Sequence, residues 1–248
     1  NTDRDIAPSI SEGFSVAQQK DKSDLFLFQL QFQKDSLVWN NNMSYQYSRL
    51  IYEDSIKDIS STHFTYRYRI SQDVQWKFKN NQMLRFETSL IIDTVRSTNL
   101  NVVQNNEFRS STALNYSKKI RNKLFIALGA RQEVFKKHIS PFLPSIAFQL
   151  SSNPNFKFEG SWSRSYKNPT WNDKYWYPGG NVDLKEELGW MTNLKISTGS
   201  VNGDFKKNIA LSCYFGRINN WIIWLPNSNA SYWSPSNLGR VEQKGVEL

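Results

Sequence analysis

From residue 24 onward, apolar and polar side chains alternate at every second position along most of the chain. The pattern is clearest in the segment 64–78, where large apolar residues hold nearly all the even positions and polar or charged residues hold the odd ones. A period of two residues is that of a β-strand, and no helical period of comparable length competes with it. These 15 alternating residues exceed the roughly five or six of a strand in an ordinary globular domain.

The same alternation predicts about eleven strands. Residues 1–23, which are mostly polar, are expected to form a loop. Beyond them, the expected strands occupy residues 24–33, 37–47, 63–78, 84–93, 108–116, 124–134, 146–150, 156–162, 188–196, 209–224 and a last segment that ends at 245–248. Most of them reach the roughly 9–11 residues that a tilted membrane-spanning strand needs. The sequence therefore predicts an all-β protein.

The connections between these strands alternate in length. Short turns are expected at 34–35, 79–81, 117–122, 151–155 and 198–204, and mostly longer loops at 50–61, 96–106, 135–142, 166–184 and 225–235. Short turns at one end and long loops at the other are typical of an antiparallel outer-membrane β-barrel, whose long loops are extracellular. The stretch 164–187, rich in aromatic residues, Asn, Asp, Pro and Gly, contains the longest of these loops, and long loops between strands are usually functional.

The two faces of the predicted strands differ in a way that favours a transmembrane barrel. One face is almost purely large and apolar, with Tyr and Trp towards strand ends, as an interfacial girdle requires. The other carries both charge signs deep within the strands, which suits a hydrated lumen. We therefore expect Tyr68 to face lipid and Arg67 and Arg69 to face the lumen. The alternative is a soluble twisted sheet with one solvated face, which leaves the strand length unexplained.

Composition narrows the class further. The chain has 248 residues, a net charge of +9 and a mean hydropathy of −0.60. No window approaches the ~18–20 apolar residues of a membrane helix, which excludes a helical membrane protein. The basic residues are dispersed, and no run of five occurs, so we expect no nucleic-acid partner.

The sequence gives little support for a catalytic site or a metal site. Cys213 is the single cysteine, which excludes an internal disulfide framework, and it falls on the apolar face. His63 and His138 lie in different segments, so we expect neither a metal site nor a cofactor. No segment shows a nucleophile elbow or a recognisable triad, and no catalytic residue is assigned. We do not expect an enzyme.

Two motifs carry a resemblance to a known family. The first comprises Arg164, Pro169-Thr170-Trp171, Asp173, Tyr175 and then Gly180-Asn-Val-Asp-Leu-Lys-Glu-Glu187. The second comprises Ile218-Asn-Asn-Trp-Ile-Ile-Trp224, Ser234-Pro-Ser-Asn-Leu238 and Gly245-Val-Glu-Leu248. Together they resemble the TonB-dependent outer-membrane receptors, in particular siderophore- and cobalamin-receptor-like members. Glu186 stands where that family usually has Pro, and before residue 164 the chain is similar only in its strand pattern.

The resemblance implies an architecture and a function. Family barrels have about twenty-two strands and a plug domain with a TonB-contacting segment, so 1–248 is expected to be a central-to-late piece of a barrel without its plug. The implied function is energised uptake of a scarce nutrient complex, such as an iron-siderophore or cobalamin, across a Gram-negative outer membrane. The implied partners are membrane lipid and lipopolysaccharide, the nutrient complex, and the TonB complex acting through the plug. The alternatives are a passive porin, a lipid- or adhesin-exporting barrel, and an enzyme on an outer-membrane barrel, such as a protease or lipase.

Candidate ligand contacts follow from the same reading. Eight aromatic residues in the expected outer loops, or at the strand end beside them, offer flat apolar surfaces to a ligand. Packing among loops or a place in the outer girdle is the simpler explanation for them. They are Trp171, Tyr175, Trp176, Tyr177, Trp221, Trp224, Tyr232 and Trp233. Arginines on the expected lumen face could bind an anionic ligand or the plug, and a paired, hydrated barrel wall is the simpler explanation. They are Arg67, Arg69, Arg85 and Arg131.

Overall fold

The computed structural model describes residues 2–6, 16–56, 58–100, 104–121, 123–153, 155–202, 205–227 and 232–248. It contains one sheet of twelve strands in which every neighbouring pair is antiparallel and the spatial order follows the chain order, from β1 to β12. The strands are β1 (Thr2–Asp5), β2 (Gln18–Lys34), β3 (Leu37–Asp54), β4 (Ile59–Phe78), β5 (Gln82–Ser97), β6 (Gln104–Ile120), β7 (Leu124–Phe135), β8 (Leu143–Asn153), β9 (Phe156–Lys167), β10 (Glu187–Asn202), β11 (Phe205–Pro226) and β12 (Trp233–Glu247).

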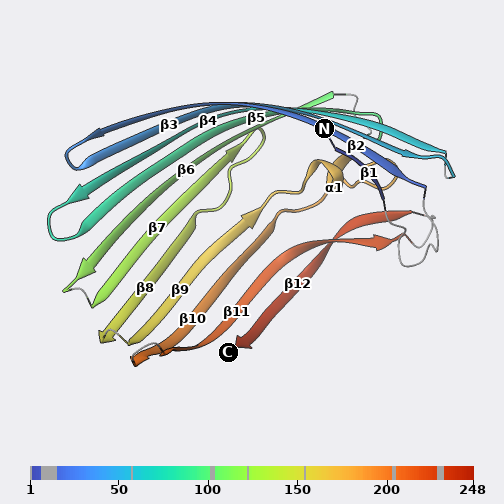
Figure 1. Cartoon of the computed structure of the whole chain (residues 1–248). Helices are drawn as coiled ribbons and strands as arrows, with labels where there is room; N and C mark the ends of the chain where they lie inside the picture. Colours follow the sequence, from blue (N-terminus) through green and yellow to red (C-terminus); the bar gives the residue numbers. More distant parts are fainter. Residues whose placement is uncertain are drawn as a thin grey trace.

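The sheet curves around a hollow, with β2 to β5 on one side and β9 to β12 on the other (Figure 1). In the described residues β1 pairs with β2 and β12 pairs with β11, and the two outermost strands do not pair with each other. One short helix, α1 (Trp171–Tyr175), lies on the concave side between the two halves (Figure 1). No helix in the described part of the chain is long and apolar enough to cross a membrane.

Cross-strand register brings like side chains onto the same face. Tyr45 pairs with Tyr68, and Tyr47 pairs with Tyr66; the ring centroids lie 4.9 and 5.3 Å apart. Because side chains alternate between faces, this register places the intervening polar positions of β3 and β4 together on the opposite face. One pairing scheme therefore separates an apolar face from a polar one across the sheet.

The convex face carries exposed apolar side chains, whereas the few buried ones gather near the long loops. Phe26, Tyr68 and Trp76 expose 67%, 52% and 51% of their surface. Buried apolar residues include Phe135 in β7 and Leu184 in the loop after β9. Packing is thus concentrated where the loops fold over the concave face.

The all-β, antiparallel prediction is confirmed, and the structure corrects its details. The sheet has twelve strands because residues 2–5, expected to be loop, form the additional strand β1. Residues 18–23, also expected to be loop, lengthen β2 at its beginning. Several loops are also shorter than predicted: residues 55–58 join β3 to β4, and 227–232 join β11 to β12. The reason is that backbone pairing continues into polar strand ends, where the apolar alternation that marks a strand in the sequence has ceased.

Candidate ligand-binding site

The loop between β9 and β10, residues 168–186, folds inward across the hollow of the sheet. Its helix α1 is capped by Thr170, whose Oγ1 accepts a hydrogen bond from the Asp173 N–H at 3.3 Å. In return, Asp173 Oδ2 accepts from the Thr170 N–H at 2.8 Å and from Thr170 Oγ1 at 2.7 Å. This reciprocal capping box satisfies backbone donors that a helix start otherwise leaves unpaired. It defines the conformation of the Pro-Thr-Trp-Asn-Asp segment.

Asp173 also ties the loop to a distant strand. Its other oxygen, Oδ1, accepts a hydrogen bond from the indole Nε1–H of Trp224 in β11 at 3.0 Å. The Asp173 carbonyl oxygen accepts from the Asn181 N–H at 2.8 Å. Asp173 is 7% exposed, so these bonds replace water around its carboxylate. Through its side chain and its carbonyl group, Asp173 thus holds α1, the second half of the loop and β11 together.

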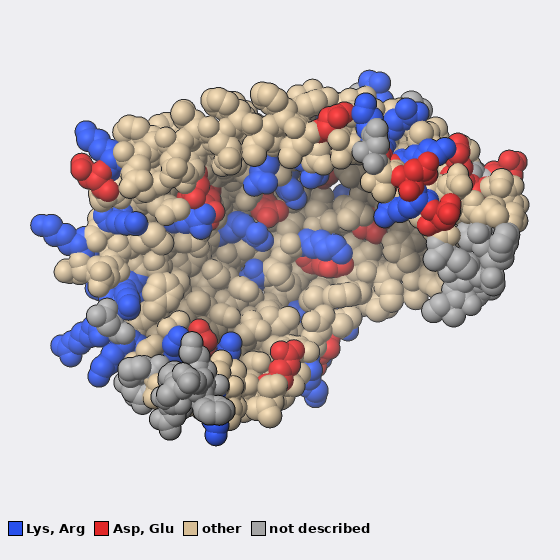
Figure 2. All heavy atoms as spheres, in the orientation of Figure 1, with Lys and Arg blue, Asp and Glu red and all other residues tan. Residues whose placement is uncertain are grey.

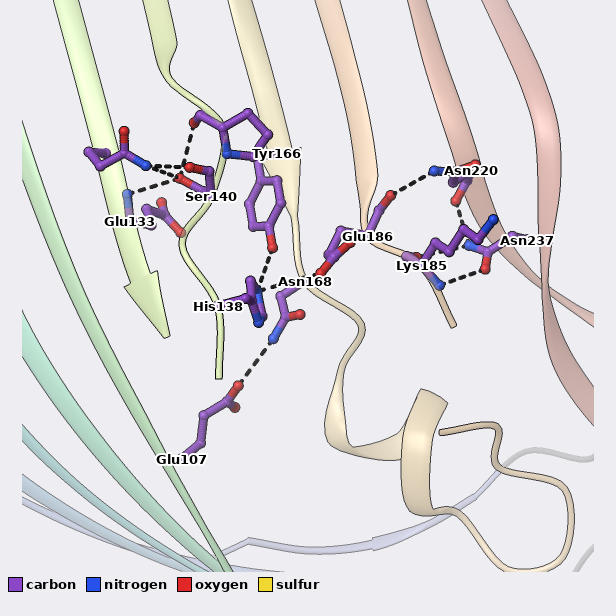
Figure 3. A network of polar contacts seen from close by, with 12 residues as sticks. Glu107, Glu133, His138, Ser140, Tyr166, Asn168, Lys185, Glu186, Asn220 and Asn237 are labelled. Atoms are coloured by element: carbon purple, nitrogen blue, oxygen red, sulfur yellow. Dashed lines mark hydrogen bonds and ion pairs between the residues drawn. The ribbon is translucent and has the colours of Figure 1, made fainter. Parts of the chain in front are cut away.

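A second clamp joins the end of the loop to β12. Asn237 Oδ1 accepts from the Lys185 N–H at 2.8 Å, and Asn237 Nδ2 donates to the Lys185 carbonyl at 3.0 Å and to the Asn220 carbonyl at 2.8 Å (Figure 3). Glu187, which is 7% exposed, accepts from the Ile222 N–H and from Lys167 Nζ, each at 3.0 Å. The two clamps thus bring the two sequence motifs into contact, although 51 or 52 residues of sequence separate the bonded partners.

At its other extreme the loop reaches the opposite side of the hollow. Trp176 forms an isolated β-bridge with Leu100, and its ring lies parallel to that of His63 in β4 at 6.4 Å. The Tyr177 N–H donates to the Asn99 carbonyl at 2.8 Å. The loop therefore spans the concave face from β11 and β12 to the end of β5.

Between these anchors, polar contacts connect the loop to β6, to the segment that follows β7, and to the end of β9. His138 Nε2 lies 2.7 Å from the Tyr166 hydroxyl and 3.6 Å from Glu186 Oε1, and Asn168 Nδ2 donates to Glu107 Oε1 at 3.2 Å (Figure 3). Asn168 Oδ1 is buried and has no hydrogen-bond partner among the described residues. Such an acceptor costs about 1–3 kcal/mol unless something donates to it.

Two cavities flank α1 on the concave side. The larger, of about 590 Å³, lies between Trp171 and Trp176 and the concave positions of β3 to β5, among them Tyr52, His63 and Arg67. The smaller, of about 370 Å³, lies between Trp171 and Tyr175 and the residues around His138, Asn168 and Glu107. Within the described ranges, no three His, Cys, Asp or Glu side chains form a group suited to a metal ion. The cavities offer aromatic, hydrogen-bonding and charged contacts.

A sequence comparison with protein families identifies the barrel. Residues 2–248 match the family described as TonB dependent receptor-like, beta-barrel. The chain belongs to this family. The resemblance drawn from the two motifs is therefore confirmed.

Individual proteins are similar to this TonB-dependent receptor chain in sequence or in fold. The vitamin B12 transporter BtuB of Vibrio vulnificus (strain YJ016) is 28% identical over 104 residues, which are 42% of this chain and 16% of BtuB. The siderophore receptor PirA from Pseudomonas aeruginosa has a TM-score of 0.80 at 12% identity, covering 93% of this chain and 46% of PirA. The hemophore receptor HasR of Serratia marcescens, solved as a double mutant in complex with its hemophore HasA and heme, has a TM-score of 0.73 at 10% identity, with 93% and 46% covered. The chain thus spans less than half the length of these relatives.

The candidate aromatic residues of this receptor chain fall into three groups. Trp171 lines both cavities, Tyr175 the smaller and Trp176 the larger. Trp224 and Trp221 line neither cavity: Trp224 donates a hydrogen bond to Asp173, and Trp221 lies opposite Leu238 in the β11–β12 pair. The others also line neither cavity: Tyr177 and Trp233 are 64% and 57% exposed, and Tyr232 lies beside the loop at Gly179.

Three of the four candidate arginines form ion pairs on the concave face. Arg67 binds Asp93 through two bonds of 2.6 and 2.9 Å. Arg85 lies 2.9 Å from Asp73 and 3.1 Å from Glu87, and Arg131 lies 3.5 Å from Glu133. Each of these three arginines therefore already has a carboxylate partner on the concave face.

Arg69 differs, and it has a counterpart that the sequence did not single out. Arg69 lies opposite Ile91, and Ile91 lies opposite Arg109, so the two arginines share one cross-strand row of the concave face. Both are exposed, and among the described residues neither has a carboxylate oxygen within 4.0 Å. Arg109 could have been found only by its place in the alternation of β6, which does not reveal whether an acid lies opposite.

Proposed function

We propose that this chain forms part of the barrel of an outer-membrane receptor that imports a scarce nutrient complex, such as an iron-siderophore or cobalamin, by a TonB-dependent process. Its membership of the TonB-dependent receptor family supports the class of protein. Its apolar convex face and polar concave face support a barrel whose outside contacts lipid and whose inside contacts water. The named relatives support nutrient complexes as the kind of cargo, since they include a vitamin B12 transporter and siderophore and hemophore receptors.

One observation carries the assignment of a ligand site: the loop 168–186 is anchored on both sides of the hollow and encloses two cavities against the concave face. A loop held by hydrogen bonds at both of its ends loses little further conformational freedom when a ligand binds. Trp171 and Trp176 present flat apolar surfaces with few rotatable bonds, which suits stacking on a conjugated or macrocyclic ligand. The unpaired Asn168 Oδ1 supplies an acceptor for a donor from a bound ligand or water.

Arg69 and Arg109, which have no carboxylate partner within the described part of the chain, would contact the negative charge of an anionic ligand. A carboxylate or catecholate oxygen reaching the row of Arg69 and Arg109 would form charge-assisted hydrogen bonds without displacing an existing ion pair. Arg67, in contrast, lines the larger cavity but already binds Asp93 in a bidentate pair. We therefore assign anion contact to Arg69 and Arg109 and a wall function to Arg67.

The proposal also covers the rest of the barrel and the other partners of the receptor. The twelve strands would form one part of a larger barrel, because the open sheet covers 46% of the receptor PirA at a TM-score of 0.80. The remaining strands and a plug would complete the pore, and the TonB complex would act through that plug. Lipid and lipopolysaccharide would contact the convex face. The long loops would face the cell exterior and the short turns the periplasm.

Uptake of radiolabelled nutrient complexes by cells carrying the complete receptor tests the function. We expect uptake that is abolished by a protonophore and reduced at least tenfold by Trp171→Ala together with Trp176→Ala. Tyr177→Ala is the matched control, because this exposed aromatic residue of the same loop lines neither cavity. Uptake that persists without energy would indicate a passive porin. Energised uptake that is unchanged in the double variant would assign these tryptophans to loop packing alone.

A further inference from the structure

The short turns concentrate nearly all of the protein's excess positive charge. The segments 34–37, 77–82, 118–124, 153–157 and 202–207 contain ten Lys or Arg and two Asp, while the whole chain has a net charge of +9. Figure 2 shows the result as a band of Lys and Arg at the end of the molecule where the short turns lie, on the left of the view. We call this the basic turn rim. The nine of its cations whose side chains are described are Lys34, Lys77, Lys79, Lys118, Lys119, Arg121, Lys123, Lys157 and Lys207.

These cations lack the pairing seen elsewhere in the chain. Among the described side chains, none of the nine has a carboxylate oxygen within 4.0 Å. Elsewhere in the sheet, by comparison, Arg4 contacts Asp21, Lys167 contacts Glu187, and Arg217 and Arg240 both contact Glu242. Unpaired like charges repel one another, so the rim is favoured where an external anion neutralises it.

The position of the rim indicates what that anion is. On the convex face, Lys34 lies opposite Leu37, which lies opposite Trp76 in the next strand. Lys118 lies opposite Gln82, which lies opposite Phe78. Trp76 and Phe78 are 51% and 43% exposed, and their rings stack at 5.2 Å. Aromatic rings followed directly by lysines are the arrangement of side chains at the boundary between lipid tails and headgroups.

We propose that the basic turn rim binds the phosphates of anionic phospholipid headgroups in the leaflet that the short turns reach. The cations are spread over five turns across the whole width of the sheet, which matches a planar membrane surface better than the footprint of one soluble partner. Each cation near such a surface adds a separate electrostatic attraction, which falls off within a Debye length. The inference rests on the membrane placement in the proposed function, and it adds a lipid preference on the side opposite the ligand site.

The test is lipid selection by the complete receptor in nanodiscs of phosphatidylethanolamine and phosphatidylglycerol. The ratio of the two lipids retained by the protein is measured by native mass spectrometry. The variant Lys34→Gln with Lys79→Gln and Lys118→Gln removes three rim charges. Lys20→Gln with Lys22→Gln and Lys185→Gln removes three exposed charges near the long loops and is the control. Circular dichroism and heat-modifiable migration verify that both variants keep the barrel.

We expect the unaltered receptor to enrich phosphatidylglycerol over phosphatidylethanolamine. In the rim variant this enrichment should fall at least fivefold at low salt, because about fivefold is the effect of removing even one cation from an anionic surface. The control should retain it. No enrichment, or an equal loss in both variants, overturns the proposal, as does equally tight binding of soluble glycerol phosphate, which would make the rim a site for free phosphate. Capture of an acidic periplasmic protein with no lipid preference also overturns it. Energised uptake is measured separately, so a failure here leaves the proposed function standing.

Discussion

The indole of Trp224 donates a hydrogen bond to Asp173 across 51 residues of sequence, with Nε1 and Oδ1 3.0 Å apart. The same carboxylate closes the capping box of α1 with Thr170. Trp224, one of the candidate aromatic residues, is therefore hydrogen-bonded to the loop that encloses the cavities. The order of that loop depends on a carboxylate shared between a helix cap and a strand.

Replacing Asp173 should release the loop while leaving the sheet intact. Asp173→Ala leaves the Thr170 N–H and the half-buried Trp224 indole without their charged acceptor, at about 1–2 kcal/mol for each bond lost. Trp224→Phe removes a single bond and should cost about 1 kcal/mol. Limited proteolysis of the complete receptor should show faster cleavage within 168–186 for Asp173→Ala, with an unchanged barrel core. Additive effects in the double variant would contradict the pairing, because partners in one bond are expected to couple.

Gly179 should tolerate no side chain. Its φ is +119°, and an added Cβ would lie 2.3 Å from the Trp233 carbonyl oxygen. Gly179→Ala should therefore disturb the contact of the loop with β12 and cost about 1–3 kcal/mol. Gly239→Ala, where nothing lies within 4 Å of the added Cβ, is the matched control. Ligand affinity and loop proteolysis provide the measurement, and equal behaviour of the two variants would refute the proposed packing.

The two kinds of arginine should respond differently to substitution. Arg69→Gln with Arg109→Gln should weaken binding of an anionic ligand by at least tenfold, with little effect on thermal stability, because no ion pair is lost. Arg67→Gln should lower stability instead, because Asp93, whose side chain is 12% exposed, would lose its cation. Calorimetric binding and melting of the complete receptor separate the two effects. A stability loss in the Arg69 and Arg109 variant alone would assign these residues to the wall.

The faces of β4 can be assigned with nitroxide labels. A label at Tyr68 should be accessible to oxygen dissolved in lipid, and one at Arg67 should be accessible to a water-soluble relaxant. Tyr68→Arg should destabilise the barrel by roughly 2–4 kcal/mol if the residue lies near the bilayer midplane. Reversed accessibilities would shift the membrane face by one residue along every paired strand.

Sidedness can be tested with epitope tags. A tag after Val182, which is 63% exposed, should be reached by antibody on intact cells. A tag in the turn at Asn80, between β4 and β5, should be reached only after the outer membrane is opened. The Gly179-Gly180 pair is a poor insertion point, because both glycines are closely packed. Protection of the first tag in intact cells would invert the proposed topology.

The sequence by itself determined the strands, their faces and the alternation of short turns with long loops. These properties are local, because a two-residue period places each side chain on one face whatever lies beside it. The alternation of β4 therefore predicted that Arg67 and Tyr68 lie on opposite faces. The same reasoning underestimated polar strand ends, such as β1 and the start of β2, since their pairing depends on a neighbouring backbone and leaves no apolar pattern.

Only the tertiary structure decided which residues meet. Arg67 is neutralised by Asp93, 26 residues away, whereas Arg69 has no acid opposite it, and that difference is set by the register of β4 on β5. Likewise, Trp176 lines a cavity whereas Trp224 of β11 binds the loop through Asp173, because the loop crosses the hollow to reach strands far along the chain. The local alternation of apolar and polar residues is the same whether an arginine is paired or unpaired, and whether an aromatic residue lines a cavity or not. The choice between these alternatives rests on long-range pairing of hydrogen bonds and charges, which exists only once the sheet has curved and the loop has folded into it.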